Sequence, residues 1–527
     1  MVVLPALGHS DGRCKTLLKR SMRKSLSIVL LLCCTSSLFA QETLGPFRSI
    51  SSVTGAAATR QDDEDVDWKE KFEKLELRLR ELEDDFVTQG SELSDERDGA
   101  GEFAESTSSE LAELSETVES LSESVSDVED AIPGFATHGG KSLKSLQVFG
   151  RIHYAYFAFP DIDDGVAPLF GGNPQDSFGF RRIRIGVKGD VNDNMFYKIQ
   201  TEFAGANNFQ FRDIFVGFKN LPIFNTVIIG NHKRPYNLDQ LNSSNDNVFL
   251  DRPFIGDAFN DNTRRLGIST SGHSDDLKYN WRSGIFNMEN VQSSGSFSGD
   301  NYQLELASRF AATPWYDECS GGRGYLHLAV SNASRFPDGL GPNNLSEYST
   351  IAESLSGNIL NTGPLVGAES ESLYGFETVF NYGPFQAVAE YTETFVDRFE
   401  PSGPNLNFHG GYIQASYFLT GEHHPWNRKL GTLGRVKPFE NFFAVRDCNC
   451  KIARGKGAWE IAARYSYIDL NDEDIAAGSA ESLTLGLNWY WNQNSRMQFN
   501  YINGDAEQAG VADGVYDIIG LQFEVFF

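Results

Sequence analysis

The stretch Glu481-Ser-Leu-Thr-Leu-Gly-Leu-Asn-Trp-Tyr-Trp491 alternates apolar and mostly polar residues, and Ile519-Gly-Leu-Gln-Phe-Glu-Val-Phe-Phe527 repeats the pattern at the end of the chain. Because successive side chains of a strand point to opposite faces, each segment has one apolar face and one mostly polar face. A soluble β-sandwich would show the same alternation. The aromatic residues on the apolar faces, and a final phenylalanine inside the last strand, favour an outer-membrane β-barrel instead.

Alternating segments of this kind recur from residue 146 to residue 527, with turn-forming residues between them. We count sixteen, the last four at 457–469, 481–493, 496–504 and 515–527, and an even number is usual for such barrels. The prediction is an all-β transmembrane barrel of about 16 antiparallel strands over 146–527. A helical membrane protein is excluded, because no apolar run reaches the roughly 18 residues that a spanning helix needs.

The residues before the barrel differ in composition. Residues 1–40 resemble a secretory signal peptide, with a basic start, an apolar centre and a cleavage site after Ala40. A linker over 41–65 leads to 66–132, where apolar residues at three- and four-residue spacing predict an α-helical coiled coil. A solvated or disordered acidic arm is the alternative. A second linker, 133–145, precedes the barrel. We expect export to the outer membrane of a Gram-negative-type bacterium, with the coiled coil in the periplasm.

The formal net charge of −27 comes mainly from one segment, since residues 61–132 hold 26 acidic and 6 basic residues. This acidity argues against nucleic acid as a partner. Residues out of phase with the apolar faces should point into the lumen. Seven acidic residues have that phase: Glu202, Asp213, Glu305, Glu377, Glu390, Glu460 and Glu524. Eleven basic residues have it too: Arg151, Arg182, Arg184, Lys188, Lys198, Arg265, Lys278, Arg282, Arg309, Arg464 and Arg496.

This basic excess has two interpretations. Paired charges could brace the barrel wall, which is the usual role of any single residue of this kind. An excess of arginine and lysine along the lumen is also how an anion or phosphate pore lowers its electrostatic barrier. Strand order places the long connection 421–456 on the periplasmic side, where short turns are expected. This connection carries eight basic and three acidic residues, which adds to the predicted attraction for anions.

Four stretches resemble the phosphate-selective porin O and P family: Phe180-Arg-Arg-Ile-Arg-Ile-Gly-Val-Lys-Gly189, Gly230-Asn-His-Lys-Arg-Pro235, Asp251-Arg-Pro253 and Gly457-Ala-Trp-Glu-Ile-Ala-Ala-Arg-Tyr-Ser466. The resemblance covers about 146–527. It implies a trimeric sixteen-stranded outer-membrane channel, narrowed by infolded loops that include a long periplasmic one. That periplasmic loop would explain the connection 421–456.

Within this resemblance, the third external loop, 231–263, corresponds to a constriction loop. It offers Lys233, Arg234 and Arg252, and Arg264 and Arg265 lie at its exit. The same loop carries five acidic residues: Asp239, Asp246, Asp251, Asp257 and Asp261. From the periplasmic connection, we expect four residues to attract anions: Arg428, Lys429, Arg435 and Lys437.

Other kinds of site find little support in the sequence. Cys319 and either Cys448 or Cys450 are candidates for a disulfide in an exported protein. Cys448 and Cys450 lack the further ligands that a metal site needs, and no catalytic motif or cofactor signature occurs. The expected partners are lipid, small anions such as phosphate, and two further copies of the chain. The expected function is passive diffusion of small anions. The alternatives are a non-selective porin, or a membrane anchor whose coiled coil tethers the outer membrane to the cell wall.

Overall fold

The computed structural model describes residues 144–205, 209–222, 224–292, 302–446 and 452–527. The predicted signal peptide, the linker 41–65 and the coiled coil 66–132 lie outside the described residues, as does nearly all of the linker 133–145. These assignments stay predictions. No helix in the described ranges is long and apolar enough to cross a membrane.

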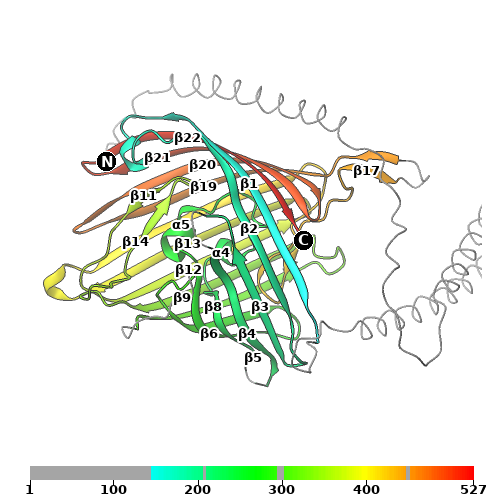
Figure 1. Ribbon diagram of the computed structural model, residues 1–527, viewed down its shortest axis with the longest axis horizontal. Coiled ribbons are helices and arrows are strands. Elements are labelled where there is room, and N and C mark those ends of the chain that lie inside the picture. Colours follow the sequence, from blue (N-terminus) through cyan, green and yellow to red (C-terminus); the bar gives the residue numbers. More distant parts are fainter. Residues whose placement is uncertain (1–143, 206–208, 223, 293–301, 447–451) are drawn as a thin grey trace, which may run out of the picture. The chain divides into compact units, whose positions relative to one another are not determined.

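Sixteen antiparallel strands form one closed barrel (Figure 1), so the predicted fold is confirmed. Neighbouring strands follow chain order, and the first pairs with the last, with Arg151 opposite Phe526. The strands are β1 (Gln147–Ile162), β2 (Ser177–Asp190), β3 (Met195–Glu202), β4 (Gln210–Leu221), β5 (Asn225–Lys233), β6 (Arg264–His273), β7 (Tyr279–Asn287), β8 (Leu304–Tyr316), β9 (Gly324–Phe336), β12 (Ala368–Tyr382), β13 (Phe385–Arg398), β14 (Leu406–Phe418), β19 (Ala458–Asp472), β20 (Ile475–Asn492), β21 (Ser495–Gln508) and β22 (Ala512–Phe526).

The barrel wall buries its polar face and exposes its apolar face, which is the reverse of a sheet in a soluble protein. In β20, the inward-facing Ser482, Thr484 and Asn488 are buried, whereas the outward-facing Leu483 is 46% exposed. A β-sandwich buries its apolar face, so this arrangement fits a barrel with lipid outside and polar groups inside. The predicted strands 481–493 and 496–504 are too short at the ends away from the hairpin that joins them, because β20 begins at Ile475 and β21 continues to Gln508.

Replacing Leu483 by arginine should destabilise the folded barrel by up to about 3 kcal/mol, since a charge on the lipid face costs most near the bilayer midplane. Urea unfolding of the protein in lipid vesicles measures this cost. Val511, which is exposed in the turn between β21 and β22, provides the control. The same substitution there should leave the unfolding midpoint unchanged. Equal losses at the two positions would contradict the assigned lipid face.

Two of the β-bulges in the barrel change which charged residues face inward. In β2, Arg181 has no partner, because the pairs made by His153 and Tyr154 of β1 fall on either side of it. In β4, Arg212 and Asp213 together oppose a single residue of β3. A bulge adds one residue to one strand, so the inward phase is kept on both sides of the insertion. Each bulge therefore brings one additional arginine to the inner face.

Three connections fold into the barrel. The constriction loop, 234–263, carries α4 (Leu238–Leu241) and α5 (Phe254–Asn260), which Figure 1 shows within the ring of strands. The connection between β9 and β12 forms a hairpin of β10 (Ser349–Ile351) and β11 (Asn358–Asn361) that packs on α5 and β20. The connection 419–457, predicted to be periplasmic, forms two hairpins. The first, β15 (Trp426–Asn427)–β16 (Thr432–Leu433), reaches into the barrel, whereas the second, β17 (Phe443–Arg446)–β18 (Ile452–Gly455), lies beyond the end of the barrel in Figure 1. Two short 3-10 helices, η1 (Ala167–Phe170) and η2 (Glu400–Ser402), lie between β1 and β2 and between β13 and β14.

These loops fill part of the lumen with an apolar core. Phe254, Ile255 and Phe259 of α5 are buried in one cluster with Tyr348 and Phe408. The hairpin β10–β11 is fixed to the wall, because Glu353 accepts hydrogen bonds from Arg464 at 2.7 Å and from Thr484 at 3.0 Å. Solute that crosses the barrel must therefore pass beside this core.

Candidate functional site

A cavity of about 860 Å³ lies inside the barrel along β1 to β7. Its opposite wall is formed by the constriction loop, from Pro235 to Thr263, and by Asn427 to Arg435 of the periplasmic connection. A water molecule occupies about 30 Å³ in the liquid, so the cavity has room for an anion together with part of its hydration shell.

Basic residues predominate in the lining of this cavity. Eleven arginines and lysines contribute to it: Arg151, Arg181, Arg182, Arg184, Lys198, Arg212, Lys233, Arg252, Arg264, Arg282 and Arg435. Five acidic residues do so: Glu202, Asp213, Asp246, Asp257 and Asp261. The net lining charge is therefore positive although the chain as a whole is acidic.

Several of the lining charges are paired on the wall. Glu202 accepts a hydrogen bond from Arg184 at 2.5 Å. Asp213 lies 2.5 Å from both Lys198 and Arg264, so two cations share one carboxylate. These pairs set the positions of the side chains and leave little charge for a solute.

Five of the lining cations have no carboxylate oxygen within 4.0 Å in the described part of the chain: Arg151, Arg182, Lys233, Arg282 and Arg435. Arg151 donates to the Ser244 hydroxyl at 2.7 Å, and Arg182 donates to Nδ1 of His153 at 3.4 Å. The guanidinium of Arg435 lies 4.2 Å from the centre of the Phe526 ring. None of these contacts brings a carboxylate to the basic group.

Lys233 is placed by the constriction loop itself. Its ammonium group donates to the carbonyl oxygens of Gln240, Leu241 and Asn242, at 2.7, 2.9 and 2.7 Å. A cation at the carboxyl end of a helix stabilises the last carbonyls of that helix. Lys233 therefore contributes to the positive lining and also fixes the end of α4.

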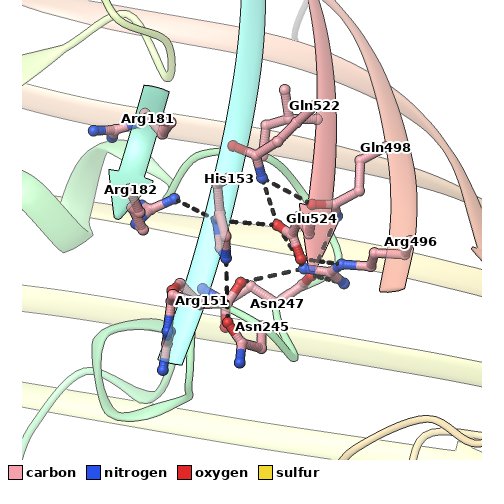
Figure 2. A network of polar contacts seen from close by, with 12 residues as sticks. Arg151, His153, Arg181, Arg182, Asn245, Asn247, Arg496, Gln498, Gln522 and Glu524 are labelled. Atoms are coloured by element: carbon pink, nitrogen blue, oxygen red, sulfur yellow. Dashed lines mark hydrogen bonds and ion pairs between the residues drawn. The ribbon is translucent and has the colours of Figure 1, made fainter. Parts of the chain in front are cut away.

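The constriction loop is attached to the strands that close the barrel, as Figure 2 shows. Arg496 of β21 donates to Glu524 of β22 at 2.7 Å, and its guanidinium also donates to the carbonyl oxygen of Asn247 at 2.8 Å. His153 of β1 lies 3.2 Å from Oδ1 of Asn245 and 3.4 Å from Glu524. The seam of the barrel and the position of this loop thus depend on one buried network.

The periplasmic connection is attached to the same cavity from the other side. The amide N–H of Leu433 donates to Oδ1 of Asn242 in the constriction loop at 2.9 Å. From β7, Arg282 donates to the Leu430 carbonyl oxygen at 3.0 Å. The part of this connection from Asn427 to Arg435 therefore folds into the lumen, and it carries Arg435 to the cavity wall.

Nine of the sixteen basic residues that were predicted to attract anions line the cavity: Arg151, Arg182, Arg184, Lys198, Lys233, Arg252, Arg264, Arg282 and Arg435. Lys188, Lys429 and Lys437 are exposed and do not belong to its lining. Arg234, Arg265, Arg428 and Arg464 do not belong to it either. Lys278, which was expected on a strand, lies in the turn before β7 and is 3.7 Å from Asp276.

The four arginines that do not line the cavity form hydrogen bonds or ion pairs with other parts of the protein. Arg234 donates to Glu305 at 2.7 Å, and Arg464 donates to Glu353 at the same distance. Arg265 donates to the carbonyl oxygens of Met288, Asn262 and Arg264. Arg428 pairs with Glu318. These side chains brace the wall and the infolded loops.

Two arginines of the lining, Arg181 and Arg212, were missed from the sequence. Under strict alternation, the neighbour of an inward-facing arginine or aspartate faces outward. Arg181 and Arg212 face inward because each lies at a β-bulge. A pair of charged neighbours within one strand, as in Arg181-Arg182 and Arg212-Asp213, was the available signal. Arg181 donates to both carboxylate oxygens of Asp251, at 2.9 and 3.2 Å, and so fixes the loop to β2.

The described residues contain no group of three or more His, Cys, Asp or Glu side chains that could hold a metal ion. Cys319 is exposed. Its predicted disulfide partners, Cys448 and Cys450, lie outside the described residues, so the disulfide stays a prediction.

Comparison with protein families matches residues 152–527 to the family described as phosphate-selective porin O and P. The chain belongs to this family. The resemblance seen in the sequence is thereby confirmed, and this porin forms a channel in the outer membrane. A protein of Caulobacter vibrioides described as uncharacterized is 29% identical over 381 residues, which cover 69% of each chain. Porin O of Pseudomonas aeruginosa is 26% identical over 158 residues, which cover 28% of this porin and 33% of Porin O.

Among solved structures, the anion-selective porin from Comamonas acidovorans is similar to this porin. It is 16% identical, with a TM-score of 0.42, and the match covers 73% of this porin and 99% of that chain.

Proposed function

We propose that this porin lets small anions, in particular phosphate and related oxyanions, diffuse passively across the outer membrane through the cavity along β1 to β7. The observation that carries the proposal is the lining of eleven basic and five acidic residues. Cations along a narrow passage lower the electrostatic barrier to an anion and raise the barrier to a cation.

The chemistry of the lining favours oxyanions. Arg151, Arg182 and Arg282 present guanidinium groups, whose planar N–H donors match the geometry of phosphate and carboxylate oxygens. Hydroxyl groups of the same lining, including those of Ser243 and Ser244, can donate further hydrogen bonds to an anion that loses water. Such a surface replaces part of the hydration shell during passage.

Two further parts of the proposal concern regions beyond the single barrel. We propose that three copies assemble, as the family resemblance implies, and that residues 66–132 extend into the periplasm as a coiled coil. The stripe of apolar residues supports the coiled coil, because such a stripe needs partner helices to bury it. Contact of this segment with the cell wall is the role we would test for it.

Planar-bilayer recording of the purified porin tests the channel proposal. In a potassium chloride gradient, the reversal potential should show preference for chloride, and added phosphate should block the chloride current in proportion to its occupancy of the cavity. A preference for potassium would contradict the proposal. A current without preference that phosphate does not block would identify a non-selective porin.

A further inference from the structure

Asp257 is the one residue of α5 that is not buried. The other six residues of this helix pack into the core, and Asp257 instead contributes to the lining of the cavity. One end of its side chain therefore meets the solute path, although the helix that carries it is fixed on its remaining sides.

The carboxyl group of Asp257 lacks the partners that several other carboxylates near the cavity have. Glu202 and Asp213 are paired with cations of the wall, and Asp251 accepts two hydrogen bonds from Arg181. In contrast, no described residue donates a hydrogen bond to Asp257: Oδ2 is buried without a partner, and Oδ1 is the oxygen that stays open. A carboxylate oxygen without a partner is costly, so a ligand that donates a hydrogen bond to Oδ1 would be favoured.

We propose that Asp257 selects among oxyanions, by accepting a hydrogen bond from those that retain an acidic O–H group and repelling those that are fully ionised. This inference rests on the proposed function, since it concerns the same cavity. The predicted consequence is that inorganic phosphate is preferred to sulfate, which has a similar size and shape but no hydrogen to donate.

The charges around Asp257 make this selection depend on pH. Burial raises the pKa of Asp257 to about 7, and the neighbouring carboxylates of Asp251 and Asp261 act in the same direction, against Arg252 and Arg181. Below that pKa the carboxyl is neutral and can donate to any oxyanion. Above it the carboxylate only accepts, so discrimination against sulfate should increase as the pH rises.

The test compares block of the chloride current by phosphate and by sulfate in planar bilayers, at about pH 5.5 and about pH 8, on either side of the raised pKa. For the unchanged porin at the higher pH, half-block should need about tenfold more sulfate than phosphate, the size expected for one charge-assisted hydrogen bond. In Asp257→Asn this ratio should fall towards one, because an amide can donate to sulfate. Variants are compared at equal pH, since phosphate itself changes charge.

Two variants serve as controls. Asp257→Glu keeps a carboxylate and should retain the preference for phosphate. Asp261→Asn removes a different lining carboxylate whose Oδ2 already accepts a hydrogen bond from Asn262 at 3.1 Å, and it should strengthen block by both anions without changing their ratio. The chloride conductance of each variant shows whether the barrel has folded.

The outcomes separate the two proposals. If phosphate blocks the unchanged porin and Asp257→Asn leaves the ratio unaltered, the role of Asp257 is wrong and the anion channel stands. If neither anion blocks, both are wrong. Methyl phosphate tests whether Asp257 recognises the acidic O–H group of phosphate. At about pH 8 both ionisable oxygens of a phosphate monoester are deprotonated, so methyl phosphate should block as weakly as sulfate. Block as strong as that by inorganic phosphate would overturn the hydrogen-bond explanation.

Discussion

Replacing Arg151 and Arg182 together by glutamine is expected to weaken phosphate block at least about tenfold and to lower the preference for chloride over potassium. Both side chains line the cavity, and among the described residues Ser244 and His153 are their only hydrogen-bonding side-chain partners. At a distance of about 5 Å and an effective dielectric constant of about 20, one charge contributes on the order of 3 kcal/mol before screening by salt. A tenfold change requires about 1.4 kcal/mol.

The control for this experiment removes the same charge elsewhere. Lys429 and Lys437 are exposed and do not line the cavity, so their joint replacement by glutamine should have a much smaller effect on block. Reversal potentials and phosphate titrations of the chloride current measure both pairs. Equal effects from the two pairs would show that the overall charge of the porin, and not the cavity, attracts the anion.

Replacing Arg496 by alanine is expected to destabilise the barrel by about 3–5 kcal/mol, because it leaves the charge of Glu524 buried without its partner. Both side chains are 1% exposed in the present structure. The carbonyl oxygen of Asn247 loses a donor in the same variant, so the constriction loop should also loosen. Urea unfolding in lipid vesicles measures the first effect, and fluctuations of the open-channel current measure the second.

A double variant separates these two effects. Arg496→Met combined with Glu524→Leu removes both buried charges, and well-packed apolar replacements of an ion pair are often neutral in stability. We expect the urea midpoint of the double variant to return most of the way to that of the unchanged porin. The open-channel current should still fluctuate, since the carbonyl oxygen of Asn247 has still lost the hydrogen bond from Arg496. An Arg496→Ala barrel as resistant to urea as the unchanged one would contradict the role given to this network.

The barrel itself could be predicted because alternation is a local property of the sequence. The segment 481–491 shows its two faces without reference to any other strand. The predicted strand ends were less accurate where β20 and β21 extend into polar residues near Ile475 and Gln508. Outside lipid both faces of a hairpin contact water, so the apolar signal disappears although the strand continues.

The candidate site was only partly predictable, because it depends on contacts between distant segments. The phase of a strand places Arg464 inside the barrel, but it does not show that the hairpin β10–β11 supplies Glu353 to pair with it. In the same way, Arg265 lies at the predicted loop exit while backbone carbonyls occupy its donors. The bulges that bring in Arg181 and Arg212 arise from strand pairing, which a single sequence does not specify.

The shared network of Arg496, Glu524 and Asn247 also has a consequence for biogenesis. Both charged residues belong to β21 and β22, which follow the other barrel strands in chain order. A barrel that had not yet added those strands would lack this attachment of the constriction loop. Closure of the barrel and full attachment of the constriction loop are therefore coupled, and we expect a pore of reduced size to form only as each barrel closes.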